Sequence, residues 1–487
     1  MEPTKFRYPL IATLEKPRMQ YVWLILITML AAALRLYKLG AWSFWIDEIY
    51  TINRAQIHFS DPIHVLQNLP STLWLPFSVI LTNISLSLFG VNEWSARLAS
   101  ALLGIVTLPV LYFITRQIFG IGIALFFILL LAMSPWHLFW SQNARFYTAI
   151  MLLYALAAFF LYLGLELDRP AYLLGFYVLF YFAISERLIA AFFLPSIPAY
   201  FILLKVLRFE LPPGFNKRNL LLLLIPFILM LAYELIRFTV SGSSITTYFI
   251  SDFGEKQVED PIRLLLAIFY NIGFPVVTTG SLAGVYLLMQ KQRIGLFLIV
   301  CATVPIVLLT LANPLFFTKD RYVFVTLTFW LFLSAVAIQR LLSWAEGSQK
   351  WLALGLLAVL LSDAIASDIL YFHVNNGNRR DWRAAFHLIR ANAQIDDRVV
   401  AWWPEFGPFY LDRPIIPYKD ITSQIVEESG NRYWFVVDSE TVWGNIPLRD
   451  WLETHAQLID VLYLRLPEDD FSLKIYLYDP AQFIPDG

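Results

Sequence analysis

Long apolar runs separated by short polar connectors occupy most of the chain. An apolar run of about 20 residues is the length that crosses a bilayer as a helix. The runs predict about eleven spans, which cover roughly residues 20–38, 96–115, 119–137, 147–166, 171–185, 188–207, 219–240, 262–289, 294–312, 322–341 and 351–372. The pattern therefore predicts a polytopic α-helical membrane protein.

One further apolar stretch, Ser71 to Gly90, is interrupted by Pro76 and by several polar residues. Basic residues concentrate in the cytoplasmic loops of membrane proteins. If the N-terminus is cytoplasmic, the later basic connectors are also cytoplasmic only when this stretch does not span the membrane. We therefore expect it to lie along or dip into the outer interface. It then belongs to a long first outer loop of about residues 38–95.

The same count of spans puts the C-terminal segment on the outer face of the membrane. Its short runs are typical of a small α/β domain. We expect strands over Val399–Trp403, Tyr433–Asp438, Leu458–Leu466 and Leu473–Tyr478, and helices over Asp381–Ala393 and Pro447–His455. The chain is thus expected to consist of a transmembrane part, 1–372, and an extracytoplasmic domain, 373–487, with Asn375–Asn378 as the linker.

Composition agrees with a membrane protein, because 58% of the residues are hydrophobic and 15% are charged. Soluble proteins carry about 25% charged residues, so a soluble enzyme, a disordered chain and a fibrous protein are excluded. The net charge of -1 and the lack of a basic run argue against a nucleic-acid partner. The single Cys301 can form neither an intrachain disulfide nor a Cys-based zinc site. The polar N-terminus is not expected to be a cleavable signal peptide.

Two adjacent carboxylates, Asp47 and Glu48, follow the first span among aromatic residues. A carboxylate at this position is able to accept a proton from a hydroxyl nucleophile or to orient a sugar through its hydroxyls. On a helix, Asp47 would share one face with Tyr50, Thr51 and Arg54. The alternative is structural, namely an acidic first helical turn that is capped by Ser43 and flanked by an interfacial aromatic belt. The sequence leaves both interpretations open.

A second polar group, Ser141-Gln142-Asn143-Ala144-Arg145-Phe146-Tyr147, stands at the outer start of the predicted fourth span. Arg145 is expected on the same aqueous side as Asp47, where it is able to pair with a carboxylate or a phosphate. The alternative is an arginine that snorkels from a helix end.

A third group, Thr318-Lys319-Asp320-Arg321-Tyr322, lies between the ninth and tenth predicted spans. Two cations on the outer face oppose the usual charge bias of membrane proteins. This favours a function such as binding an anionic lipid phosphate, and the alternative is a local charge cluster without a function.

Glu186 and Arg187, in a short outer turn, are interpreted as a self-neutralising pair. No P-loop, dinucleotide-binding or HExxH motif is present.

In their order and sidedness, these groups resemble the GT-C-type polyprenyl-phosphate-sugar glycosyltransferases, particularly the protein O-mannosyltransferase and lipid A aminoarabinose transferase branch. The resemblance covers roughly residues 20–345 and rests on the Asp-Glu of the first outer loop, the later Ser-Gln-x-Ala-Arg-x-Tyr and the Arg-Tyr that begins a span. The segment that begins Asp381-Trp382-Arg383 is similar to the extracytoplasmic domain of many bacterial members.

The resemblance implies an integral membrane enzyme whose catalytic residues are Asp47, as the base, and Glu48, as its neighbour. It implies a substrate site that includes Arg145, Tyr147, Arg321 and Tyr322. Tyr50 and Arg54, on the helix face of Asp47, and Lys319, beside Arg321, are also expected to bind the substrate. Two departures from the family pattern, at Trp74-Leu75-Pro76-Phe77 and at Asn143, leave the acceptor contacts and the sugar open.

The expected reaction moves a sugar from a polyprenyl phosphate to an acceptor hydroxyl or similar nucleophile on the outer face of the cell membrane, with inversion of the anomeric carbon. The expected partners are this donor, membrane lipid and an acceptor lipid, glycan or protein. No cofactor is firmly implied, since Asp47 and Glu48 alone are too few ligands for a divalent metal. The alternatives are a transporter or flippase of lipid-linked saccharides and a non-catalytic assembly factor.

Overall fold

A computed structural model describes residues 17–56, 76–241, 260–313, 318–344, 350–438, 445–463 and 472–482. These residues form two compact units. As far as the described residues extend, unit 1 comprises Met1–Tyr37, Val65–Leu81 and Ala99–Ile365. Unit 2 comprises Lys38–His64, Thr82–Leu98 and Ala366–Gly487. Each unit is described by itself.

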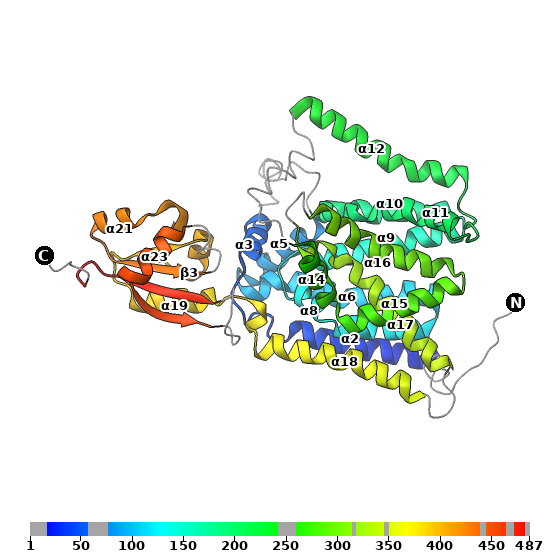
Figure 1. Cartoon of the computed structure of the whole chain (residues 1–487), viewed down its shortest axis with the longest axis horizontal. Helices are drawn as coiled ribbons and strands as arrows, with labels where there is room; N and C mark the ends of the chain where they lie inside the picture. Colours follow the sequence, from blue (N-terminus) through cyan, green and yellow to red (C-terminus); the bar gives the residue numbers. More distant parts are fainter. Residues whose placement is uncertain are drawn as a thin grey trace. The chain divides into compact units, whose positions relative to one another are not determined.

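Unit 1 is a bundle of apolar helices (Figure 1). Its elements are α2 (Pro17–Leu36), α7 (Ile121–Met133), α8 (Pro135–Ser141), α9 (Tyr147–Glu166), α10 (Pro170–Glu186), η1 (Leu188–Phe193), α11 (Ser196–Val206), α12 (Lys217–Ser241), α14 (Pro261–Ile272), α15 (Phe274–Met289), α16 (Arg293–Ala312), η2 (Asp320–Thr326) and α17 (Leu327–Trp344). Three further helices contribute residues to both units, namely α5 (Phe77–Phe89), α6 (Glu93–Phe119) and α18 (Lys350–His373).

Helix α17 lies at the centre of the unit 1 bundle, where it packs against α7, α15 and α16. Its residues from Leu327 to Val336 are all buried. A helix that is apolar on every side is stable only when other helices surround it, so this element belongs to the interior. Helices α9 and α10 pack along each other in the same bundle.

All eleven predicted spans fall on helices of the described chain. Within the described ranges, seven helices are long and apolar enough to cross a membrane, or nine if each of two bent pairs counts as one span. The two remaining predicted spans correspond to α10, which has 17 residues, and to α12, which has 25. Helix α5 has 13 residues, about 20 Å at 1.5 Å per residue, which is too short for a hydrocarbon core of about 30 Å.

Two of the predicted spans are broken rather than straight. The expected span 119–137 consists of α7 and α8, which meet at 61°, because Pro135 has no N–H and begins a new helix. The expected span 262–289 consists of α14 and α15, which meet at 89°. Gly273 joins them with a φ of 97°, a conformation that residues with a side chain rarely adopt.

Unit 2 contains α3 (Ile46–Ala55) and a five-stranded sheet in the order β2-β1-β3-β5-β4. The strands are β1 (Arg398–Ala401), β2 (Ile415–Pro417), β3 (Tyr433–Val437), β4 (Gln457–Leu462) and β5 (Leu473–Tyr478). β1 is parallel to β2 and β3, whereas β5 is antiparallel to β3 and β4. The helices and turns are η4 (Asn376–Asn378), α19 (Trp382–Asn392), η5 (Pro404–Phe406), α20 (Gly407–Tyr410), η6 (Tyr418–Asp420), α21 (Ser423–Ser429) and α23 (Ile446–His455).

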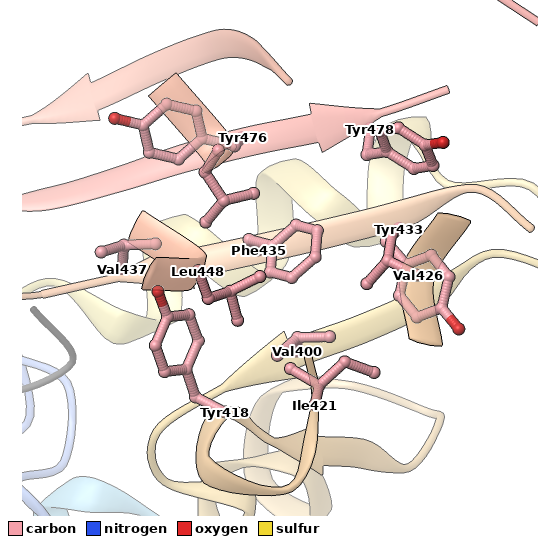
Figure 2. Close-up of a cluster of buried hydrophobic side chains, with 11 residues drawn as sticks. Val400, Tyr418, Ile421, Val426, Tyr433, Phe435, Val437, Leu448, Tyr476 and Tyr478 are labelled. Atoms are coloured by element: carbon pink, nitrogen blue, oxygen red, sulfur yellow. The ribbon is translucent and has the colours of Figure 1, made fainter. Parts of the chain in front are cut away.

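Alternate residues of the central strand enter the core on one face of this sheet. Figure 2 shows Tyr433, Phe435 and Val437 of β3 pointing into this cluster. The cluster is completed by buried side chains of the neighbouring strands, of η6 and of the helices α21 and α23, namely Val400, Tyr418, Ile421, Val426, Leu448, Leu452, Tyr476 and Tyr478. All five residues of β3 are buried, and such a short apolar run is the signature from which this strand was predictable.

The described part of the C-terminal segment differs from the sequence prediction in three places. Strand β2 has only three residues and ends in Pro417, and α21 has seven, so neither contains a long enough periodic run to be predicted. The expected linker is a packed turn in which Gly377 has a φ of 63°. A Cβ on Gly377 would lie 1.3 Å from Nε1 of Trp42, so only glycine fits at this position.

Candidate functional site

Helix α3 begins at Ile46, after the turn that follows α2. Asp47 and Glu48 are the second and third residues of this helix. The carboxylate of Glu48 accepts a hydrogen bond from the backbone N–H of Trp45 at 3.1 Å, and it thereby caps the helix. Ser43, the cap proposed in the structural alternative, instead donates its hydroxyl to the carbonyl oxygen of Arg380 at 2.7 Å. The proposal of Ser43 as the cap is therefore wrong.

A buried ion pair holds the start of α3. Arg97, in the first turns of α6, donates from Nε and Nη2 to the two carboxylate oxygens of Glu48, each at 2.8 Å. Both side chains are fully buried. The same guanidinium donates to the backbone carbonyls that lead into α3, at 3.1, 3.0 and 2.9 Å, which belong to Leu39, Trp42 and Ser43. Arg97 therefore binds both the helix and the turn before it.

Asp47 is partly exposed on the face of α3 opposite to this ion pair. Thr51 donates its hydroxyl to the backbone carbonyl of Asp47 at 3.0 Å. Asp47, Tyr50, Thr51 and Arg54 share the less buried face of α3, whereas Ile46, Glu48, Ile49, Ile52 and Ala55 form the buried one.

Tyr50 links α3 to η5, with which the helix packs. Its phenol donates to Oε1 of Glu405 at 3.4 Å. Burial, followed by the charges of Glu405 and Asp47, raises the pKa of Tyr50. The phenol therefore remains a protonated hydrogen-bond donor at neutral pH.

Two guanidinium groups approach one aromatic ring in unit 1. Arg145, which precedes α9, lies 5.0 Å from the centre of the Phe146 ring, and Arg187 lies 5.7 Å from it. Glu186 does not neutralise Arg187, because its carboxylate accepts from the backbone N–H and the hydroxyl of Ser78 at 2.9 and 2.5 Å. The interpretation of Glu186 and Arg187 as a self-neutralising pair is therefore wrong. Two cations around one ring form a positively charged surface.

The loop that carries Arg145 is held by two reciprocal helix caps. Gln142 donates its amide to carbonyl oxygens at the end of α2, those of Leu34, Arg35 and Tyr37, at 3.2, 3.1 and 2.7 Å. Arg35 in turn donates to the carbonyls of Leu131 and Ala132 at 3.2 and 3.0 Å, which the break after α7 leaves without helical partners. These hydrogen bonds fix the start of the loop that carries Arg145.

Tyr147, which the resemblance assigns to the substrate site, is only 1% exposed. Its ring packs 3.8 Å from the ring of Trp140 and 6.2 Å from that of Phe324. The structure therefore places Tyr147 among aromatic side chains of the interior of unit 1.

The third predicted group lies at the start of η2, where Lys319, Arg321 and Tyr322 are partly exposed and the following residues are buried. Asp320 accepts a hydrogen bond from the side-chain amide of Asn271. η2 packs against α9 and η1. Because Arg145 precedes α9 and Arg187 precedes η1, the cations of the second and third groups come from neighbouring elements of one unit.

The predicted site residues thus form two groups. Unit 2 holds Asp47, Glu48, Tyr50 and Arg54, whereas unit 1 holds Arg145, Tyr147, Lys319, Arg321 and Tyr322. Among the described residues, no three His, Cys, Asp or Glu side chains are grouped so that they could hold a metal ion.

Comparison with known proteins identifies the fold. Residues 76–233 match the family model described as dolichyl-phosphate-mannose-protein mannosyltransferase. ArnT from Cupriavidus metallidurans has a similar structure, with a TM-score of 0.55 at 15% sequence identity, over 95% of this chain and 98% of that chain in its apo state. The structure of ArnT bound to undecaprenyl phosphate gives the same TM-score and identity over 94% and 98%.

The chain has the GT-C glycosyltransferase fold. The predicted resemblance to the GT-C-type enzymes is confirmed, as are the multi-span membrane architecture and the small C-terminal sheet. No curated protein sequence matches this chain.

Sequence reasoning missed three residues that the structure brings to the two groups, namely Arg97, Glu405 and Tyr410, and it assigned Arg187 to the wrong partner. Only Arg97 carried a recognisable signal. An arginine at the start of a predicted span is costly unless it is paired, and Glu48 was one of the acids expected on the same side. The partners of Arg187, Glu405 and Tyr410 lie far from them in the sequence, and no motif connects them.

Proposed function

We propose that this chain is a GT-C glycosyltransferase, which transfers a sugar from a polyprenyl phosphate to an acceptor hydroxyl or similar nucleophile at the outer face of the membrane. The observation that carries the proposal is that the adjacent acids Asp47 and Glu48 have different environments. The carboxylate of Glu48 is fully buried in its ion pair with Arg97, whereas that of the adjacent Asp47 lies on the less buried face of α3. ArnT, which has the same fold, binds undecaprenyl phosphate, and this supports a polyprenyl phosphate as the donor.

In the proposed reaction, the acceptor oxygen attacks the anomeric carbon from the face opposite to the phosphate. The bond from that carbon to the phosphate oxygen breaks, and its electron pair remains on the phosphate. Asp47 takes the proton of the acceptor hydroxyl. A single displacement inverts the anomeric carbon, and no covalent sugar–enzyme intermediate is needed. Glu48 is assigned to positioning, since a fully buried carboxylate does not reach a substrate.

The cations of unit 1 are proposed to bind the donor phosphate. Lys319 and Arg321 at the start of η2, with Arg145 and Arg187 on the neighbouring elements, supply charge-assisted hydrogen bonds to a phosphate. The phosphate of the product carries more negative charge than the phosphodiester of the donor, because a phosphate monoester is nearly dianionic at neutral pH. Fixed cations therefore stabilise the leaving group as its charge develops.

The proposal is tested by comparing cells with and without the gene. Mass spectrometry of lipids, glycans and surface proteins should reveal a sugar-sized mass difference in one class, which identifies both sugar and acceptor. Purified protein in detergent should then transfer that sugar from its polyprenyl phosphate. If no class of molecule changes, and the purified protein releases no polyprenyl phosphate from a panel of such donors, the proposal is wrong.

Transport of a lipid-linked saccharide is the second candidate function. The observation that favours it is the pair of bent helices, because transporters place substrates at interrupted spans. At the bend between α14 and α15, the carboxylate of Asp363 lies beside Gly273. Transfer in detergent distinguishes the two functions, since translocation requires a sealed membrane and sugar transfer does not.

Removal of the Arg321 guanidinium group at the start of η2 is expected to weaken donor binding. In Arg321→Ala, loss of a charge-assisted hydrogen bond should raise the donor KM about tenfold, with a smaller change in kcat. Arg187→Ala should change KM in the same direction. Initial rates at varied donor concentration measure both effects. Arg340→Ala, which removes a cation at the other end of α17 beside Tyr286, is the matched control, and an equal effect there would contradict the assignment.

The proposed orientation places the N-terminus in the cytoplasm and the C-terminal segment outside. The native Cys301 is buried, so Cys301→Ala gives a background for labelling. Ile395→Cys, at a position that is 95% exposed, should react with a membrane-impermeant maleimide in intact cells. Gln290→Cys, in a connector expected to be cytoplasmic, should react only after permeabilisation. The opposite pattern would reverse the proposed orientation.

A further inference from the structure

The C-terminal segment and the turn before α3 are joined within unit 2 by a buried tyrosine. The phenol of Tyr410 donates to Oε1 of Glu93 at 2.9 Å and accepts the backbone N–H of Phe44 at 2.6 Å. The Tyr410 and Phe44 rings are 6.2 Å apart, and the Phe409 ring lies 5.3 Å from that of Phe44. Burial, followed by the charge of Glu93, raises the pKa of Tyr410, which keeps its phenol protonated.

Three arginines that precede or begin α19 strengthen this junction. Arg383 forms an ion pair with Glu93 at 3.3 Å, and the backbone carbonyl of Arg380 accepts the hydroxyl of Ser43. Arg379 is buried and lies 4.0 Å from Glu48. Burial and the neighbouring charge of Arg97 lower the pKa of Arg379. The ion pair that orients α3 is therefore completed by a residue of the C-terminal segment.

Apolar contacts enclose the same turn. Trp42 packs on Gly377, where a side chain would collide with it. The rings of Tyr371 and Phe372 lie 6.0 and 6.2 Å from that of Trp42. Further along the helix, Tyr50 donates to Glu405 at 3.4 Å. The C-terminal segment thus contacts both the turn before α3 and residues of α3 itself.

We propose that the C-terminal segment is a positioning element of the active site and that Tyr410 is the residue through which it orients the catalytic helix. The inference rests on the proposed function of Asp47 as the base. A displacement of about 1 Å of a catalytic group lowers a rate about a hundredfold. The segment that carries Asp47 has only ten helical residues of its own, and short helices depend on tertiary contacts for their geometry.

The test compares two tyrosines of the same segment in the full-length protein. Tyr410→Phe removes the hydroxyl that joins Phe44 to Glu93, whereas Tyr418→Phe removes a buried hydroxyl of the sheet core that has no partner among the described residues. With an undecaprenyl-phosphate sugar that the unaltered chain uses, Tyr410→Phe should lower kcat about tenfold or more. The donor KM should change less than twofold, because the donor phosphate is held by unit 1. Tyr418→Phe should keep full activity.

The split between kcat and KM separates positioning from a general loss of folded protein, and the thermal transition of each variant checks its fold. If Tyr410→Phe does not fold, Tyr50→Phe decides instead, since it breaks the more exposed link to Glu405 and should lower kcat severalfold. Full activity of the folded variant, an equal loss in Tyr418→Phe, or a change confined to KM overturns the inference. If Asp47→Asn is inactive while Tyr410→Phe is fully active, only the inference fails, and if Asp47→Asn is active, the proposed function fails.

Discussion

Asp47→Asn should lower the rate of sugar transfer about a thousandfold while donor binding remains. The amide has nearly the same shape as the carboxylate but accepts no proton, and general-base catalysis contributes about 10²- to 10⁴-fold. The fold should persist, because the charge of one residue in a first helical turn stabilises by only about 0.3–1 kcal/mol. Single-turnover rates and the donor KM of the purified variant measure the two expectations separately.

The matched control for this variant is Asp412→Asn in the same unit. Asp412 is 74% exposed and pairs with Arg390 on the surface of the C-terminal segment, so its substitution should leave the transfer rate unchanged. An Asp47→Asn enzyme with near-complete activity would remove Asp47 as the base. A loss of both donor binding and folded protein would assign it a structural function instead.

Arg97→Met should destabilise unit 2 by about 3–5 kcal/mol, because it leaves the Glu48 carboxylate buried without its partner. It also removes a donor from three backbone carbonyls. Native proteins are stable by only about 5–15 kcal/mol, so a large loss of folded protein or a strongly lowered thermal transition is expected. The exposed pair of Arg390 and Asp412 gives the control, since Arg390→Ala should cost about 1 kcal/mol or less.

A double-variant cycle isolates the ion pair. Glu48→Gln alone leaves Arg97 charged and buried without its carboxylate partner. Arg97→Met alone leaves Glu48 charged and buried without its guanidinium partner. The double variant removes both charges, and it should lose less stability than the sum of the two single variants. Additive losses would contradict a coupled pair. Glu48→Gln should also slow sugar transfer, because α3 loses its orientation, and it should lower the stability of the protein. Asp47→Asn should slow sugar transfer without lowering the stability.

Much of the architecture was predictable because it depends on local composition. Each predicted span lies on helices of the described chain, since an apolar run of sufficient length has few other solutions in a bilayer. The strands β1, β3 and β5 were predictable from short apolar runs. The bends after Met133 and Ile272 were not predicted, although Pro135 and Gly273 mark them. A proline or glycine permits a break, and only the packing of neighbouring helices decides whether a span uses it.

The candidate site was predictable in part. Asp47, Arg145 and Arg321 attract attention because charged residues beside apolar runs are rare and costly. The partners that give each of them its environment are distant in the sequence. Glu48 and Arg97 are 49 positions apart, and Phe44 and Tyr410 are 366 apart. No local pattern records such pairings.

The sequence by itself determined the membrane class, the helical spans, the C-terminal sheet and the acidic and basic residues that stand beside the spans. These properties follow from the length and period of apolar runs, which act over one turn or one strand at a time. Only the tertiary structure decided that Glu48 is buried with Arg97, that Arg145 and Arg187 approach the same Phe146 ring, and that Tyr410 binds the turn before α3. Such contacts form when segments that are remote in the sequence are buried against each other. A buried charge or N–H group then pairs with a partner that the fold places within reach.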